Sequence, residues 1–183
     1  PASSAASPSS GLPTAASARA AAPTIAGSSL WSLIALRAAN AIVACTSFDL
    51  GRSANCASDD NARALVAMCQ HYELTREEAD LEYITTYLNF IKRCLQAEGY
   101  FLNYIDDDGC FTEQNNVINV ADSNGRALWA LGYVLSLSAL LPEELVLEAE
   151  LLMQHGLEHV RNIHSPRAIA FIIKGLYYYN STN

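Results

Sequence analysis

One short segment occurs three times in this chain, and this repeat constrains the fold more than any other feature. Residues 58–67 (SDDNARALVA) align without a gap with residues 121–130 (ADSNGRALWA), and residues 165–170 (SPRAIA) form a fainter third copy. The three copies share an arginine followed by alanine, at Arg63, Arg126 and Arg167. A recurring segment indicates a recurring structural unit, so we expect an array of similar elements.

Each copy opens a stretch with the periodicity of a helix. Apolar residues at spacings of three and four predict one helix from Ser58 and a second from about Leu81 to Leu95. Residues 100–121 contain turn-forming sequences and predict a long ordered loop. Three more helices are predicted, over about 123–140, from Pro142 to about 160, and from Pro166 to Tyr179.

These patterns predict an all-α fold, a helical-hairpin array in which a mostly apolar inner helix precedes an amphipathic outer one. The repeated arginines are separated by 63 residues and then by 41, which is too irregular for a TPR or ankyrin array. The spacing favours part of an (α/α)6-toroid-like arrangement. Residues 1–29 are nearly all Ala, Ser, Pro, Gly and Thr and predict a low-complexity segment, and residues 30–183 predict the helical domain.

Composition excludes several classes of protein. The net charge of −8 and the lack of a basic run exclude a nucleic-acid-binding surface. Uninterrupted apolar segments fall short of the roughly 18 to 20 residues of a membrane span, so we expect no membrane partner. Five cysteines without a C-x-x-C pair predict reduced, structural thiols, and no signal-peptide pattern is present, which together favour a cytoplasmic protein.

Carboxylates stand at the helix starts of the first two copies. Asp59, Asp60 and Asp122 are candidate catalytic residues if the helix ends meet at one cavity, because glycoside hydrolysis requires two carboxyl groups. The neighbouring polar side chains are candidates for substrate binding: Asn61, Arg63, Asn124 and Arg126. The alternative is structural, with the acids capping helix ends or pairing with arginine. Asp60 is the distinctive position, because Ser123 replaces it in the second copy.

The loop over residues 99–111 combines aromatic rings with acids and an amide, a composition that can stack against a sugar and hold its hydroxyls. Its candidates for substrate binding are Tyr100, Asn103, Tyr104 and Asp106, and Trp129 is a candidate for the cavity floor. The alternative is a turn at Asp108 and Gly109, with the aromatic side chains anchoring it to the core.

Metal and cofactor motifs find little support. His155 and His159 fit an H-x-x-E-H zinc motif, but no acid follows them to complete the ligand set, and they fall on an outer helix. An EF-hand loop with Gly109 at its sixth position would place Tyr104 at the first ligand position and Asn115 at the last. Both positions normally hold an acidic residue, so the sequence does not fit an EF-hand. We therefore expect no metal and no cofactor.

Four strings together resemble a known family: residues 58–65 (SDDNARAL), 99–104 (GYFLNY), 121–132 (ADSNGRALWALG) and 165–168 (SPRA). They are similar to bacterial glycosidase-like (α/α) toroids, often described as glycosyltransferase-associated or glycoside-hydrolase-like and found near mannoside-processing enzymes. The resemblance covers about Cys45 to Tyr179. It implies a toroid and an oligosaccharide or glycoside as ligand, with the polar residues of both DxN segments at the family's motif positions.

Two functions compete at this point, with unrelated toroid chemistry such as isoprenoid cyclisation as a distant third. One is a glycoside hydrolase, with Asp60 or Asp122 as acid or base. The other is a non-catalytic glycan-binding or scaffold module that pairs with a glycosyltransferase or with a second copy of itself. An open cavity shared by Asp59, Asp60 and Asp122 and lined by an aromatic wall would favour the enzyme, whereas acids that each cap their own helix and are sealed by arginine would favour the module.

Overall fold

The computed structural model describes residues 56–181, and these residues are mostly helical, which confirms the all-α class. The five long helices are α2 (Ser58–Thr75), α3 (Ala79–Cys94), α5 (Ala121–Ser136), α6 (Glu143–His159) and α7 (Pro166–Asn180). The short elements are β1 (Cys56–Ala57), β2 (Tyr104–Ile105), α4 (Gln114–Val117) and the 3-10 turn η1 (Val160–Asn162). The predicted boundary between residues 29 and 30 lies outside the described part of the chain.

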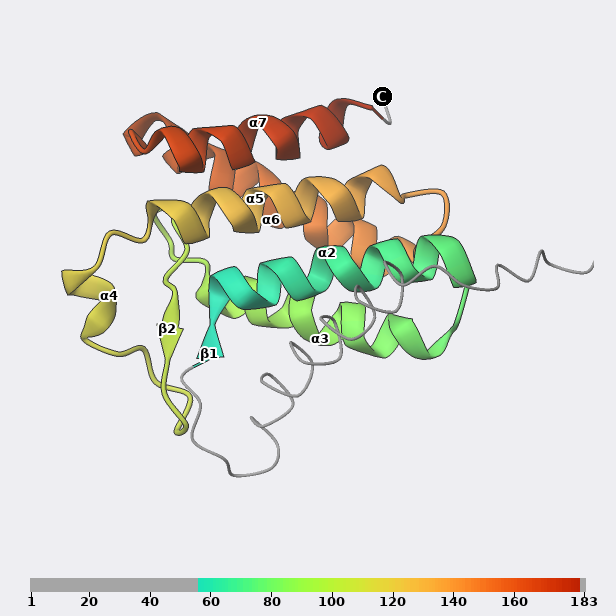
Figure 1. Cartoon of the computed structure of the whole chain (residues 1–183), viewed down its shortest axis with the longest axis horizontal. Helices are drawn as coiled ribbons and strands as arrows, with labels where there is room; N and C mark the ends of the chain where they lie inside the picture. Colours follow the sequence, from blue (N-terminus) through green and yellow to red (C-terminus); the bar gives the residue numbers. More distant parts are fainter. Residues whose placement is uncertain (1–55, 182–183) are drawn as a thin grey trace, which may run out of the picture.

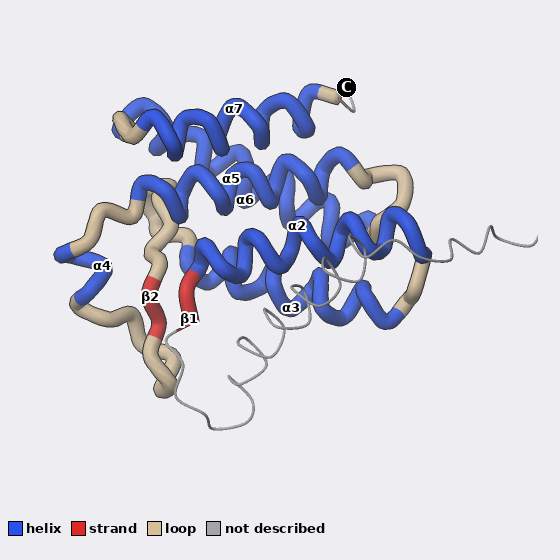
Figure 2. Tube along the Cα trace, in the orientation of Figure 1, coloured by secondary structure: helices blue, strands red, loops and turns tan. Residues whose placement is uncertain are grey.

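The long helices form two layers. Helices α2, α5 and α7 lie side by side and run in the same direction, so that all three begin at the same end of the molecule (Figure 1). Helices α3 and α6 return in the opposite direction and pack on α2 and α5 respectively (Figure 2). The described residues therefore contain two helical hairpins, α2–α3 and α5–α6, followed by α7 as a third inner helix.

Small residues bring α5 and α7 into close contact. A Cβ atom on Gly125 would lie 2.6 Å from the backbone oxygen of Ala168, and one on Gly132 would overlap the backbone of Gly175. The second repeat thus carries glycine on the face that meets α7. Backbones this close leave no room for side chains between them, so the two helices are held in one register.

The buried core is continuous between the layers. Its largest fully buried side chains include Leu65, Ile84, Tyr87, Leu88, Ile91, Phe101, Leu128, Leu131 and Met153. Residues from all five long helices and from the loop between α3 and α5 contribute to the core or pack against it. Burial of apolar area on this scale is the main favourable contribution to folding.

The long loop between α3 and α5 is ordered by amide side chains. Strand β2 pairs antiparallel with β1, so that Tyr104 lies opposite Ala57 and the loop crosses to the start of α2. The Asn115 side chain accepts hydrogen bonds from the backbone of Asn103 (2.7 Å) and Tyr104 (2.9 Å) and donates to the Tyr104 carbonyl (2.8 Å). The strand pair and helix α4 were not predicted from periodicity, since each is shorter than one apolar repeat.

Helix α5 ends four residues before its predicted terminus. Its last residue is Ser136, and a turn leads from there to Pro142, where the next helix starts. Leu137 and Leu141 are both buried within this turn, so the apolar pattern continues past the end of the helix. Within residues 56–181, no helix combines the length and apolar character needed to cross a membrane.

Candidate functional site

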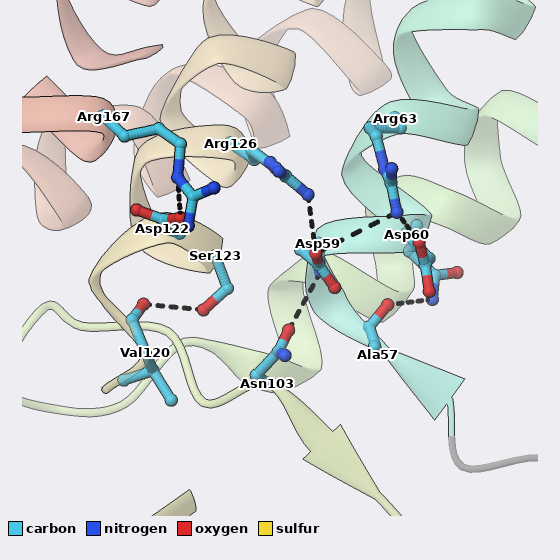
Figure 3. A network of polar contacts seen from close by, with 11 residues as sticks. Ala57, Asp59, Asp60, Arg63, Asn103, Val120, Asp122, Ser123, Arg126 and Arg167 are labelled. Carbon is cyan, nitrogen blue, oxygen red and sulfur yellow. Dashed lines mark hydrogen bonds and ion pairs between the residues drawn. The ribbon is translucent and has the colours of Figure 1, made fainter. Parts of the chain in front are cut away.

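The first turns of α2, α5 and α7 lie at one end of the inner layer, and the repeated polar segments meet there (Figure 3). The structure brings together most of the acids and arginines that the repeat pointed to. The Asp59–Arg126 and Asp122–Arg167 contacts join neighbouring inner helices, whereas the Asp60–Arg63 pair lies within α2.

Asp59 in the first turn of α2 binds an arginine of the next repeat. Its carboxylate accepts a hydrogen bond from Arg126 Nη1 on α5 at 2.7 Å, and both side chains are largely shielded from water. The Asp59 backbone N–H donates to Asn103 Oδ1 at 3.0 Å, which ties the loop to the same helix start. Arg63 Nη2 lies 4.0 Å from Asp59 Oδ2, the same oxygen that Arg126 binds.

Asp122 in the first turn of α5 repeats the same relationship one helix further along. Its carboxylate pairs with Arg167 Nε on α7 and accepts a hydrogen bond from Ser165 Oγ at 3.1 Å. Because Asp122 is the repeat equivalent of Asp59, and Arg167 that of Arg126, the two ion pairs are copies of one contact. We call this pair of contacts, Asp59–Arg126 and Asp122–Arg167, the aspartate–arginine ladder.

Asp60 stands apart from the ladder. It pairs with Arg63 of its own helix, and both side chains are about half exposed. Arg63 is the repeat equivalent of Arg126 and Arg167, but within the described residues no inner helix precedes α2 to supply an aspartate. Asp60 provides that carboxylate instead. At the equivalent position of α5, Ser123 donates its hydroxyl to the Val120 carbonyl at 2.7 Å.

The asparagines of the two motifs hold backbone groups. Asn61 is buried and donates to the Ala57 carbonyl at 2.8 Å. Asn124 is also buried; it accepts from the Phe101 N–H at 2.7 Å and donates to the carbonyls of Phe101 (2.8 Å) and Val120 (2.9 Å). Every strong hydrogen-bonding group of the Asn124 amide is therefore used to fix the loop against α5.

The loop residues predicted to bind sugar do not share one surface, because each lies in a different local structure. Asn103 is buried beneath the start of α2, and Tyr104 lies in the strand pair. Tyr100 packs against His159, with ring centroids 5.3 Å apart. Asp106 Oδ1 accepts a hydrogen bond from the Cys110 N–H at 2.7 Å, and so closes the turn that contains Gly109 at φ +77°. Asp106 therefore has the role of the alternative prediction, a residue that stabilises the turn at Asp108 and Gly109.

Trp129 is covered on its ring by neighbouring side chains. It stacks on Phe171 with centroids 5.7 Å apart, and Lys174 Nζ lies 3.9 Å from the centre of the indole. The Arg126 guanidinium lies 5.1 Å from the Phe171 ring, which extends the ladder into this cluster of aromatic and cationic side chains. The Trp129 ring is thus already in contact with an aromatic and a cationic side chain of α7.

The two histidines of the zinc-like motif have separate roles. His155 Nε2 lies 3.0 Å from the Ala97 carbonyl, whereas His159 packs on Tyr100. Both belong to the outer helix α6, as predicted, and no acid joins them in a metal-binding group within residues 56–181.

One titratable cluster was missed by sequence reasoning. His71 Nδ1 lies 2.7 Å from Asp80 Oδ2, and Asp80 is almost fully buried between α2 and α3. Glu77 lies close enough that one atom from each of the three side chains falls within 4.8 Å of the others. The sequence shows only a histidine nine residues before an aspartate, on either side of the turn between two predicted helices. Such a spacing is too common to indicate a site.

Burial also changes the chemistry of two groups in the core. Desolvation raises the pKa of the Cys69 thiol far above its usual value near 9.0, with a smaller contribution from Glu73. The pKa of Tyr133 is raised in the same way by burial and by its hydrogen bond to Glu73. Both groups therefore stay protonated to a higher pH than they would in the unfolded chain.

The acids of the repeats bind arginines, the asparagines bind backbone groups, and Trp129 packs on Phe171. Comparisons with protein-family models, with curated proteins and with solved structures each found no match to this chain.

Proposed function

We propose that this chain is a non-catalytic scaffold or glycan-binding module, built as part of an (α/α)6-toroid-like array. The observation that carries the proposal is the aspartate–arginine ladder. Asp59 and Asp122 each bind an arginine of the neighbouring inner helix, and Asp60 binds Arg63. All three carboxylates that the sequence offered as catalytic groups are engaged by guanidinium groups.

Glycoside hydrolysis makes demands that these carboxylates meet poorly. One carboxyl group must protonate the leaving oxygen, while the other attacks the sugar or activates water. A carboxylate that accepts hydrogen bonds from arginine has fewer lone pairs left for a substrate. The ladder instead joins α2 to α5 and α5 to α7, which is a role in holding the array together.

The surroundings of the ladder favour the scaffold over the glycan-binding module. The Asn124 amide is buried and already bonded to backbone groups, and the Trp129 ring packs against Phe171 and Lys174. The toroid-like arrangement is supported by three parallel inner helices with outer helices on the first two. A cytoplasmic location is part of the proposal, supported by the free thiols of Cys69 and Cys110.

A glycoside hydrolase is the second candidate, favoured by one observation. Asp60 is the most exposed of the three acids, with 53% of its side chain accessible, and its arginine is equally exposed. Such a pair is weak and can open at small cost when a ligand approaches. Asp60 would then be the catalytic carboxyl group, with oligosaccharide bound across the helix starts.

The test is a thermal-shift screen of the full chain against mannosides, glucosides, uronides and their oligomers, with reducing-end assays on the same samples. Wild type, Asp60→Asn and Asp122→Asn are compared. The module predicts no turnover by any of the three proteins, with or without a stabilising sugar. Turnover by wild type that Asp60→Asn abolishes, while its melting temperature stays unchanged, would establish the hydrolase and overturn the proposal.

A further inference from the structure

Helix α7 carries an apolar stripe that faces water. Ile169, Ile173 and Tyr177 are 39%, 61% and 69% exposed, and they follow one another at spacings of four residues. The opposite face of α7 packs on α5 through Ala168, Ile172 and Gly175, which are buried. An exposed row of three large apolar side chains on one helix is costly to leave in water.

The repeat identifies what this face does in the earlier inner helices. Ile169 and Ile173 are equivalent to Leu128 and Gly132 of α5, and these two positions lie against α7. In α2 the same positions are also buried, at Leu65 and Cys69. The exposed stripe of α7 therefore lies on the face with which an inner helix contacts the next one.

A further helix could not approach this face as closely as α7 approaches α5. The close approach of α5 to α7 depends on Gly125 and Gly132, but Pro166 and Ile173 occupy these positions in α7. The ladder also stops, because Ile163 stands where Asp59 and Asp122 stand in the other copies, so no aspartate is offered to a further arginine. The face is shaped for a partner that packs at ordinary side-chain distance.

We propose that this partner is a second copy of the chain, packed α7 against α7 about a twofold axis that passes near Ile173. Residues four apart form one ridge on a helix surface, and two such ridges interlock at a crossing angle of about −50°, the commonest class of helix packing. In a twofold arrangement Ile173 meets Ile173, while Ile169 meets Tyr177 of the partner copy.

The distribution of charge supports self-association at this face. All 19 acidic residues precede Val160, so α7 and the residues after it contain none. The cations of α7 are already engaged, since Arg167 pairs with Asp122 and Lys174 lies over Trp129. Two copies of a chain with net charge −8 repel one another, and a contact through α7 places no acidic residue of that helix in the interface.

Sedimentation equilibrium of the full chain over a wide concentration range tests the proposal. Wild type is expected to form a dimer, and Ile173→Glu and Ile173→Lys are each expected to weaken association at least about tenfold. Mixing the two variants in equal amounts is expected to restore most of the lost affinity, because the opposite charges meet on the axis. Leu151→Glu on α6, where leucine is 65% exposed, is the matched control and should leave association unchanged.

Three outcomes would overturn the interface: a monomeric wild type, a dimer that Ile173→Glu leaves intact, or variants that fail to complement one another. Circular dichroism and melting temperatures confirm that each variant is folded, and Tyr177→Ser provides a milder variant. A monomeric wild type that Ile173→Glu strongly destabilises would indicate that another segment of the same chain covers the stripe, and this too overturns it.

The inference rests on the proposed scaffold function and names its partner, yet the two can fail separately. Turnover of a glycoside by these samples would remove the non-catalytic proposal whatever their oligomeric state. A monomer without turnover would remove the α7 interface and leave the module in place.

Discussion

The Asp59 carboxylate accepts a hydrogen bond at 2.7 Å from Arg126, 67 residues further along the chain, and this contact joins the first turns of α2 and α5. The same contact recurs between Asp122 and Arg167 at the start of α7. The first two repeats therefore each supply an acid to the following inner helix, and the second and third each supply an arginine to the preceding one. The repeated polar motif thus connects successive inner helices.

Replacing Arg126 with methionine tests the ladder, because methionine keeps the apolar contacts and removes the charge. The variant leaves the shielded Asp59 carboxylate without its partner, so the free energy of unfolding should fall by about 1–2 kcal/mol. Urea denaturation at neutral pH measures the change. A double-mutant cycle with Asp59→Asn separates the coupling of the pair from the loss of each side chain.

The control for this prediction is Arg63→Met. Arg63 and Asp60 are both about half exposed, so removing their pair should change the free energy of unfolding by at most about 0.5 kcal/mol. Equal losses at Arg63 and Arg126 would contradict a special role for the contact between repeats.

A second prediction concerns Asn124, whose side-chain amide binds both backbone groups of Phe101. Asn124→Asp keeps the size of the side chain but turns an oxygen toward the Phe101 and Val120 carbonyls, where the amide nitrogen donates now. We expect a loss of about 2–4 kcal/mol, measured as a lower urea midpoint. Asn116→Asp is the matched control, since Asn116 is exposed and binds only Glu113; a comparable loss there would contradict the prediction.

The helices were predictable because their evidence is local. Apolar spacings of three and four report directly which face of a helix is buried, and all five long helices were predicted to begin within about three residues of their observed starts. The predicted end of α5, near residue 140, was wrong because a buried turn continues the same apolar pattern through Leu137 and Leu141. The strand pair and α4 are too short to leave a periodic signal.

The pairing of the polar residues was not predictable in the same way. Arg126 lies four residues after Asp122, a spacing that permits an ion pair within the helix, yet it binds Asp59 of the previous repeat. The choice depends on how closely and in which register the inner helices pack, and that is set by tertiary contacts. The His71–Asp80 pair was missed for the same reason, since it depends on how α3 folds back on α2.

A third prediction concerns the close contact of α5 with α7. Gly132→Ala should gain about 1 kcal/mol in helix propensity, but its methyl group would overlap the backbone of Gly175. We expect the overlap to dominate and to lower stability by about 1–3 kcal/mol. Thermal unfolding followed by circular dichroism measures this. Ala170→Leu, at an exposed position on α7, is the control, and a stabilised Gly132→Ala variant would contradict the close packing.

A fourth prediction concerns thiol reactivity. Cys110 is exposed, whereas Cys69 and Cys94 are buried, and burial raises the pKa of Cys69 so that its thiolate is scarcely populated. In native buffer a maleimide should label Cys110 rapidly and the two buried thiols only after denaturant is added. Mass spectrometry of the digested protein assigns each label. Labelling of Cys69 at the rate of Cys110 would contradict the buried core between α2 and α3.

A fifth prediction follows from the raised pKa values of Cys69 and Tyr133. In the unfolded chain these groups ionise near their ordinary values of 9.0 and 10.0, while in the folded protein both stay protonated to higher pH. Above about pH 9 the unfolded state therefore binds fewer protons, and the free energy of unfolding falls as pH rises, by up to about 1.4 kcal/mol per pH unit for each group.

Urea denaturation between pH 8 and pH 11 measures this slope in wild type, Cys69→Ala and Tyr133→Phe. Each variant removes one ionisable group, so the stability difference between wild type and variant should shrink as pH rises through the alkaline range. The difference at pH 8 reports the lost packing or the lost hydrogen bond to Glu73, and it serves as the reference for each variant. A difference that stays constant from pH 8 to pH 11 would show that the native group ionises as freely as the unfolded one, and that water reaches it in the core.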